Sequence, residues 1–491
     1  MDSSRRVEPH AIVVFCSGQG HINPCMLLSR SLAAMGFHVS FICFSSYSGQ
    51  LQQMNRSLLP DPADLAGRVS GRICVHVLDD GLEHRDLDKP FLSNSTMKES
   101  LLTFINGKQE MDVGRPTCIV SEPFAPWTLE VAQRAGIPRV EFHSSNALAY
   151  LVMTNLVHLY SEGIYPEKRL VFSPILSMRD VLRSPTKWTA ENPVMLDHIP
   201  GFPPFRSEIM PAELRFNDAS HPLVKLITEI ESCSKHSERV LIHSFIDIEP
   251  TAFKALELQG AKAYDVGPLP DPGKKTSSSK AECISWLDSQ GDHSVIYIAF
   301  GSISTLSVEE MQELALGLEG SGCPFMWVIR KDNQKEKDLS QILPEGFLER
   351  TKGRGMIISW APQVEVLSHR AVGGFLSHCG WNSTLESLQA GVPMLCCPRI
   401  AEQRLNCYYV CEQWNAGVEM MRTDIGGLEK KYVETGIKAL LYGEEGLQAR
   451  DNAQRIMELA KKSHKEGGHA VANLQRFYDD MRALCSMSHS P

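Results

Sequence analysis

The stretch VGGFLSHCGWNSTLESLQAGVPMLCCP, residues 372–398, decides the fold of the C-terminal half of this protein. It opens with an apolar run that ends at Ser377, and after HCGWN we predict a helix from about Ser383 that ends before Gly391. A second short apolar run, from Pro393, closes the stretch. Strand, turn, helix and strand in this order predict a parallel βαβ unit.

The turn HCGWN between this strand and helix has the composition of an anion site. The first-turn amides of a helix lack partners within the helix, and the helix dipole favours negative charge there. His378 can donate a hydrogen bond to a phosphate, and Gly380 lets the backbone come close. However, Ser383 and Glu386 also have the spacing of a capping box. The residues alone leave two interpretations open, a diphosphate site and a plain helix cap.

Short apolar runs alternate with amphipathic segments along the whole chain. A capping box at Ser307 to Glu310 predicts the start of one helix in the second half. This alternation predicts the α/β class, with two doubly wound Rossmann-like domains whose parallel sheets carry helices on both faces. A cleft between two such domains is the default place for a ligand. The expected strands are residues 11–16, 38–44, 72–78, 117–121, 138–142, 294–300, 325–330, 355–359, 372–377 and 393–396.

The boundary between the two domains lies at PDPGKKTSSSK, residues 270–280. Proline, glycine, serine and lysine without apolar periodicity predict a flexible linker. We therefore expect an N-terminal domain over residues 1–265, a linker over 266–280 and a C-terminal domain over 281–466. The irregular, proline-rich residues 163–222 predict loops on the first domain.

The overall composition is that of an ordinary globular protein. Among 491 residues, 49 are basic and 58 acidic, and the net charge of −9 argues against a nucleic-acid partner. No apolar run is long enough to span a bilayer and no signal peptide is evident, so we expect a cytoplasmic protein. The 14 cysteines are scattered, and neither Cys407 and Cys411 nor Cys396–Cys397 has a zinc-site spacing. We expect reduced thiols and no metal.

The first turn of the chain, SGQGHINP at residues 17–24, follows the apolar run AIVVFC. A dinucleotide loop would need a third glycine, and the side chain of His21 would obstruct a pyrophosphate. Histidine instead suits a general base, because its ordinary pKa is near neutrality. We predict that Asn23 and Pro24 open the following helix, which places His21 at the carboxyl edge of the first sheet. A purely structural histidine is the alternative.

The block WAPQVEVLSHRAVGGFLSHCGWNSTLESLQAGVPMLCCPRIAEQ, residues 360–403, closely resembles the signature box of the plant secondary-product UDP-glycosyltransferases. The resemblance continues through SGQGHINP, VGPL, SWLDSQ, IAFGS and GGHAVANLQRF, and so covers essentially the whole chain. It implies the GT-B architecture, in which two Rossmann-like domains face each other and the C-terminal one binds the sugar nucleotide. It also implies that a last helix, within residues 467–491, crosses back to the N-terminal domain.

The resemblance assigns a role to each residue of the donor site. Trp360 would stack on the uracil ring, Ala361 and Gln363 would meet the base and ribose, and Glu386 would accept hydrogen bonds from the ribose hydroxyls. Trp360 could instead be a core aromatic residue. The residues implied to hold the diphosphate are Ser302, His378, Asn382 and Ser383. Those implied to contact the sugar are Ser144, Trp381, Glu402 and Gln403, although Gln403 could be an exposed helix-start residue.

The resemblance also implies that His21 is the general base. A carboxylate usually orients such a histidine, and in the family it is an aspartate followed two positions later by phenylalanine. Here CIVSEPFAPW places Glu122 at this position, which keeps the charge but adds a methylene. Other departures are His143 for a frequent tryptophan, Ser144 for a frequent threonine, and Arg399 and Ile400 for apolar or aromatic residues.

Together these features predict an inverting UDP-sugar-dependent glycosyltransferase, most simply a glucosyltransferase, that needs no metal or other cofactor. The acceptor would be a small lipophilic hydroxyl compound such as a flavonoid, another phenolic, a terpenoid or a hormone. Its contacts would come from the turn at residues 80–83, the loop after Glu122 and residues 163–222. We expect a monomer. The alternative is a catalytically weak UDP-sugar or small-molecule binding protein of the same fold, and a nicotinamide-dependent oxidoreductase would need the missing glycine.

Overall fold

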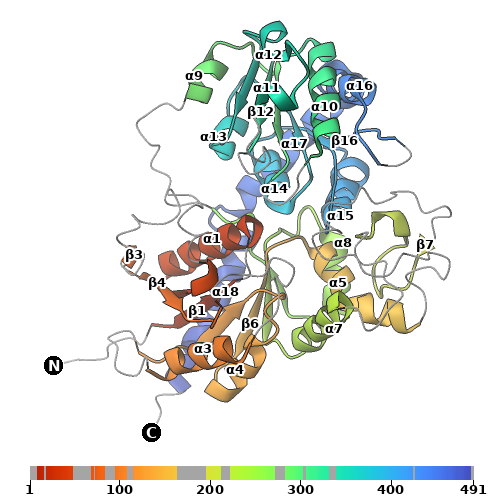
Figure 1. Cartoon of the computed structure of the whole chain (residues 1–491). Coiled ribbons are helices and arrows are strands. Elements are labelled where there is room, and N and C mark those ends of the chain that lie inside the picture. The colour runs from red at the N-terminus through yellow and green to blue at the C-terminus, as the bar shows by residue number, and fades with distance from the viewer. Residues whose placement is uncertain are drawn as a thin grey trace.

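The computed structural model describes residues 8–15, 18–47, 68–70, 72–82, 94–107, 114–162, 195–211, 222–270, 282–301, 306–330, 339–423 and 426–487. Within them, every strand expected from the sequence forms, with ends within two residues of the expected ones. The strands assemble into one large sheet in each half of the chain, and Figure 1 shows the two halves as separate lobes. The two-domain α/β prediction is confirmed.

The N-terminal sheet has the strand order β10-β9-β6-β5-β1-β2-β4-β3, and all neighbours are parallel except β3 and β4. Strands β2, β4 and β3 lie on one side of β1, and the later strands β5, β6, β9 and β10 lie on the other side. The order therefore reverses between β1 and β5, which are hydrogen-bonded neighbours. The strands are β1 (His10–Val14), β2 (His38–Phe44), β3 (Arg68–Ser70), β4 (Ile73–Leu78), β5 (Cys118–Ser121), β6 (Arg139–His143), β9 (Arg239–Ile242) and β10 (Ala263–Asp265).

The C-terminal sheet has the order β13-β12-β11-β14-β15-β16, entirely parallel. Numbered from its own first strand this is 3-2-1-4-5-6, the Rossmann order, with the reversal between β11 and β14. The strands are β11 (Val295–Ala299), β12 (Phe325–Val328), β13 (Gly355–Ile358), β14 (Val372–Ser377), β15 (Met394–Cys396) and β16 (Gly417–Glu419). A separate two-stranded sheet joins β7 (Met195–Leu196) and β8 (Phe205–Arg206).

Helices cover both sheets, and the apolar side chains between the layers form the cores. In the first half these helices are α1 (Gln19–Met35), α3 (Ser95–Gly107), α4 (Thr128–Ala135), α5 (Ala147–Ser161), α7 (Pro222–Ser234) and α8 (Pro250–Leu258). In the second half they are α9 (Glu282–Asp288), α10 (Val308–Ser321), α11 (Leu339–Ile342), α12 (Phe347–Arg350), α13 (Gln363–Leu367), α14 (Trp381–Gln389), α15 (Gln403–Tyr408), α16 (Lys430–Tyr442), α17 (Glu444–Ser463) and α18 (His469–Met487). Short 3-10 or π turns are η1 (Ser45–Tyr47), η4 (Ser207–Ile209) and η7 (Tyr409–Gln413).

The last helix, α18, packs against the N-terminal domain, and Figure 1 shows its blue ribbon behind the red and orange elements. The ring of Phe477 stacks on Phe37 at 5.6 Å, and Asp480 forms an ion pair of 2.8 Å with Arg239 at the start of β9. Phe477 is fully buried in the core that contains β1 and β2. The C-terminal segment therefore ties the second half of the chain to the first.

Two predicted helix starts are wrong, and both lie at the functional turns. Helix α1 begins at Gln19, so Asn23 is no N-cap and Pro24 lies inside the helix. Helix α14 begins at Trp381 after Gly380, with no side-chain cap, so the capping box predicted from Ser383 does not form. The box at the start of α10 does form, with both reciprocal hydrogen bonds.

Some predictions fall outside the described residues. They concern Ser302, most of the linker and most of residues 163–222. No helix among the described residues is long and apolar enough to cross a membrane.

Candidate active site

Both functional turns lie where the strand order of their sheets reverses. His21 follows β1 and Glu122 follows β5, the two strands at the reversal of the N-terminal sheet. His378 follows β14 at the reversal of the C-terminal sheet. In open parallel sheets this point leaves a crevice at the carboxyl ends of the strands, where ligands bind. Figure 1 shows α1 and α14, which carry these turns, next to each other where the lobes meet.

His21 and Glu122 form a close pair. The imidazole Nδ1 lies 2.8 Å from Oε1 of Glu122, whose side chain is fully buried. The hydroxyl of Ser144 donates to the same carboxylate oxygen at 2.7 Å, and the ring of Phe124 meets the imidazole edge-on at 5.7 Å. Because Nδ1–H donates its hydrogen bond to the carboxylate, Nε2 is the nitrogen that can accept a proton from a substrate.

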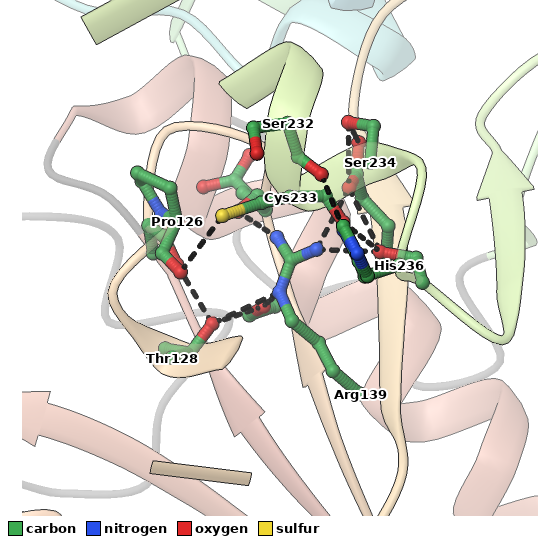
Figure 2. Close-up of polar contacts among 12 residues, drawn as sticks. Pro126, Thr128, Arg139, Ser232, Cys233, Ser234 and His236 are labelled. Carbon is green, nitrogen blue, oxygen red and sulfur yellow. Dashed lines mark hydrogen bonds and ion pairs between the residues drawn. The ribbon is translucent and has the colours of Figure 1, made fainter. Parts of the chain in front are cut away.

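The backbone that carries Glu122 is held by Arg139, a fully buried residue of β6. One terminal nitrogen of its guanidinium donates to the carbonyl oxygen of Glu122 at 3.3 Å. Its Nε donates to the hydroxyls of Ser121 at 3.0 Å and Thr128 at 3.1 Å, so one side chain joins the end of β5 to the start of α4. Figure 2 shows this guanidinium pointing toward Thr128, at the start of α4.

The positive charge of Arg139 is balanced inside the protein. Glu141, two residues along β6 and also fully buried, accepts a hydrogen bond from Arg139 at 2.8 Å. The carboxylate of Glu141 also accepts from the hydroxyls of Ser234 at 3.0 Å and Ser237 at 3.2 Å. Figure 2 labels Ser234 near Arg139. Such saturation by hydrogen bonds is what a buried ion pair needs to be tolerated.

At the other turn, no side chain caps the start of α14. Its N-cap is Gly380, which has no side chain to occupy the first amides. Next to it the buried His378 has its pKa lowered to about 4 by burial, so the ring is neutral near pH 7. Its Nδ1 has no hydrogen-bond partner among the described residues. A Cβ at Gly301 or Gly380 would lie 2.5 or 2.4 Å from its Nε2, so both glycines are required by the close approach of this ring.

Gln363, at the start of α13, gathers the residues predicted to bind the nucleoside. Its amide nitrogen donates to Oε2 of Glu386 at 2.8 Å and to the hydroxyl of Ser383 at 3.1 Å, and its oxygen accepts from Tyr297 at 3.1 Å. Glu386 is therefore oriented by Gln363 rather than by a helix cap. Trp360 stands before α13 with 62% of its surface exposed, which contradicts the core alternative.

Ala361 lies buried directly beside this exposed indole. The exposed indole of Trp360 is a flat, apolar surface of the kind on which a nucleobase can stack.

The start of α15 lies opposite the His21 turn. Burial raises the pKa of Glu402, an effect that the nearby His21 and hydrogen bonds from Asn406 and the Trp381 backbone oppose. Gln403 is buried, so the exposed alternative is wrong. Its side-chain oxygen accepts from the backbone amides of residues 399 and 400 at 2.8 and 3.0 Å, which leaves its amide nitrogen as the donor available to a ligand.

The departure at Arg399 has a structural explanation. Its guanidinium binds the Glu310 carboxylate through two hydrogen bonds of 2.6 and 2.9 Å, and both side chains are largely buried. Glu310 is the last residue of the capping box that starts α10. The ion pair therefore fixes the loop before Glu402 to a neighbouring helix.

Three residues of the implied donor site make other contacts in the structure. The indole nitrogen of Trp381 donates to the backbone oxygen of His243 at 2.7 Å inside the core, so the one hydrogen-bond donor of this side chain is already used. Ser144 is bound to Glu122, a positioning role that the sequence did not reveal because 22 residues separate the two. Asn382 donates to the backbone oxygen of Gly20 at 3.1 Å, a contact between the domains.

The turn expected to contact the acceptor is described only as far as residue 82. Its Asp80 is buried and accepts hydrogen bonds from the hydroxyl of Ser45 at 2.7 Å and the amide of Ser46 at 3.3 Å. This carboxylate therefore holds the end of β2 to the end of β4. Because Asp80 is buried, its carboxylate is not exposed to a bound acceptor substrate.

Three buried sulfur atoms, those of Cys379, Cys396 and Cys407, lie within 4.8 Å of one another. The sequence spacing hid this cluster because its members come from three different elements. Burial raises the pKa of the Cys379 and Cys396 thiols, whereas hydrogen bonds from the neighbouring thiols lower the pKa of Cys407. Protonated thiols in such a setting pack as small apolar groups, whereas a metal would need them deprotonated.

Comparison with known proteins gives concordant matches. A family model described as UDP-glucoronosyl and UDP-glucosyl transferase matches residues 227–465. The chain is 34% identical over 490 residues to UDP-glycosyltransferase 85A1 of Arabidopsis thaliana, with 94% of each chain covered. It is 32% identical over 490 residues to the 7-deoxyloganetin glucosyltransferase of Gardenia jasminoides, with 95% of this chain and 96% of the relative covered. A solved structure of Phytolacca americana UGT2 complexed with UDP-2fluoro-glucose and pterostilbene matches with a TM-score of 0.78 and 26% identity, covering 96% of this chain and 99% of that one.

Proposed function

This chain belongs to the plant UDP-glycosyltransferase family, and we propose that it transfers glucose from UDP-glucose to a hydroxyl group of a small lipophilic acceptor. The observation that carries the proposal is the His21–Glu122 pair, which lies beside the open first turn of α14. The His21–Glu122 pair supplies a base for an acceptor hydroxyl, and the start of α14 supplies hydrogen-bond donors for the departing diphosphate.

The reaction is a single displacement at the anomeric carbon. His21 Nε2 takes the proton of the acceptor hydroxyl as its oxygen attacks, and the Glu122 carboxylate stabilises the resulting imidazolium. The bond to UDP breaks on the opposite side, and its negative charge is met by the α14 amides and the neutral His378 ring. Attack opposite the leaving group inverts the configuration, so an α-linked donor yields a β-glucoside.

The donor would lie along the C-terminal domain. The exposed indole of Trp360 suits stacking on uracil, and Glu386, already oriented by Gln363, suits the ribose hydroxyls. Glucose as the sugar is supported by the Gln403 amide and by relatives named as glucosyltransferases.

The acceptor would lie against the N-terminal domain. Phe124 places an aromatic ring against His21, which favours a lipophilic molecule whose hydroxyl points to the imidazole. Relatives are named for the terpenoid 7-deoxyloganetin and for (R)-mandelonitrile, and a similar structure contains pterostilbene. A terpenoid or phenolic alcohol is therefore the acceptor class that we propose.

We also propose that the reaction needs no metal, since the helix start and His378 already supply donors to the leaving group. Every described cysteine is a free thiol, which supports a reducing, cytoplasmic location. One chain carries both turns, so a monomer suffices.

The test is a screen of UDP-sugars against phenolic, terpenoid and cyanohydrin acceptors by liquid chromatography and mass spectrometry. We expect a glucoside whose anomeric proton coupling shows the β configuration, with activity kept in EDTA. His21→Ala should lower kcat by about 10²–10⁴-fold while UDP affinity, measured by calorimetry, is unchanged. UDP binding by the wild type without transfer to any acceptor would instead favour a binding protein.

A further inference from the structure

Helix α1 contains a proline beyond its first turn. The helix begins at Gln19, so Pro24 is its sixth residue. In an α-helix the amide of residue 24 would donate to the carbonyl oxygen of residue 20, four positions earlier. Proline has no such amide, and its ring clashes with that carbonyl. The oxygen of Gly20, immediately before His21, thus lacks its usual helical donor.

The other domain supplies a donor. The side-chain nitrogen of Asn382, the second residue of α14, donates to the Gly20 oxygen at 3.1 Å. Figure 1 shows the two helices next to each other where the lobes meet. A carbonyl released by a proline in one domain is therefore bound by an amide from the helix that faces the diphosphate.

The amide of Asn382 has a second hydrogen. Its nitrogen carries two hydrogens, of which one points to Gly20, and its Oδ1 is buried without a partner among the described residues. A phosphate oxygen at the start of α14 can accept the second hydrogen. The same side chain would then touch the leaving group and the turn that carries His21.

We propose that Asn382 and Pro24 are positioning residues, through which a bound UDP-sugar fixes His21 for proton transfer. This proposal rests on the proposed glucosyl transfer. Donor binding orients Asn382, Asn382 holds the Gly20 carbonyl, and this holds the next residue at its distance from the acceptor. An error of about 1 Å in such a placement can lower the rate by about 10²-fold.

A double-mutant cycle tests the coupling. Asn382→Ala should lower kcat by about tenfold and raise KM for UDP-glucose, because it loses both contacts. Pro24→Ala restores an amide that draws the Gly20 carbonyl into the helix, so kcat should fall by a similar factor with KM for UDP-glucose unchanged. The kcat of the double variant should be no lower than that of whichever single variant has the lower kcat. Multiplying effects on kcat, or a wild-type kcat in Pro24→Ala, would overturn the proposal.

Pro250→Ala is the matched control, since Pro250 occupies the first turn of α8, where a helix needs no amide. It should leave kcat unchanged.

A second readout needs no acceptor. Hydrogen exchange of a peptide covering residues 18–26 should slow when saturating UDP is added to the wild type. This protection should be lost in Asn382→Ala and reduced in Pro24→Ala, and its persistence in both variants would refute the coupling. Because UDP alone is used, this result stands apart from a failure to find glucosyl transfer.

Discussion

Glu122 reaches His21 with the same carboxylate oxygen that accepts the Ser144 hydroxyl, at 2.8 and 2.7 Å. The added methylene, relative to the aspartate of the family, is therefore accommodated by the surrounding structure. Arg139 holds the Glu122 backbone while Ser144 and His21 hold its carboxylate. The pair is built for glutamate, and this leads to the first prediction.

Shortening this carboxylate should impair the enzyme. Glu122→Asp withdraws the oxygen from His21 by more than an ångström, so we expect kcat to fall by about 10–100-fold. Glu122→Gln keeps the shape but loses the charge that stabilises the imidazolium, and kcat should fall further. Steady-state kinetics measure both, with unchanged UDP affinity as the control. A faster Glu122→Asp enzyme would show that the glutamate is a handicap.

The Ser144 hydroxyl should matter through Glu122. Ser144→Ala removes one donor to a buried carboxylate, and we expect kcat to fall by about tenfold with KM for UDP-glucose nearly unchanged. Ser144→Thr keeps the hydroxyl and should retain most activity. If Ser144→Ala instead raised KM for the donor alone, the residue would contact the sugar, as the resemblance first implied.

Trp360 should contribute to donor affinity. Because base–aromatic stacking is worth about 1–3 kcal/mol, Trp360→Ala should raise the Kd of UDP by about tenfold or more. Tyr442 is a matched control, with 61% of its surface exposed against 62% for Trp360. Isothermal titration of UDP into Trp360→Ala and Tyr442→Ala measures the two affinities. An equal loss of UDP affinity in both variants would contradict the stacking role of Trp360.

Removing one partner of the Arg139–Glu141 pair should destabilise the protein more than removing both. Arg139→Met leaves the Glu141 charge buried and uncompensated, so the free energy of unfolding should fall by about 3–5 kcal/mol. Adding Glu141→Leu should restore much of this loss in urea denaturation. The double variant should nevertheless be slower in catalysis than the wild type, because the Glu122 carbonyl oxygen loses its hydrogen bond from Arg139.

Stability should fall in mild acid because of buried neutral histidines. Burial lowers the pKa of His243 to about 3, and its Nε2 accepts a hydrogen bond from the amide of Leu269. The unfolded state, with a histidine pKa near 6.5, binds protons first as the pH falls. Between pH 7.5 and 5.5 this one group should cost about 1.4 kcal/mol of unfolding free energy.

His243→Gln keeps an acceptor but cannot titrate. Urea denaturation at the two pH values should therefore show a smaller loss in this variant than in the wild type. An equal loss would place the acid sensitivity elsewhere.

Local patterns in the sequence were sufficient where they depend on nearby residues. The apolar runs predicted the strands to within two residues, and Ser307 and Glu310 form the expected capping box. The block at residues 360–403 identified the family, which the comparisons confirm. These features depend on neighbours a few positions away, so their physical cause is contained in the stretch itself.

The same kind of pattern failed at Ser383 and Glu386. A capping box was equally compatible with these residues, but Gly380 starts the helix earlier and Gln363, from a separate segment, takes the Glu386 carboxylate. The prediction that Pro24 starts a helix was wrong for a similar reason. Proline is favoured at helix starts, but Pro24 lies inside α1, and Asn382 of the other domain binds the Gly20 carbonyl oxygen that lacks its helical donor.

The sequence by itself thus determined two Rossmann-like domains and the family, and it predicted His21 as the base. Only the tertiary structure decided that Glu122 reaches His21, that Ser144 donates to Glu122, and that the Trp381 indole lies in the core. The reason is physical. Strands and helix starts are set by interactions within a few residues, whereas an acid–base pair is set by distances between side chains 101 positions apart, which only packing can fix.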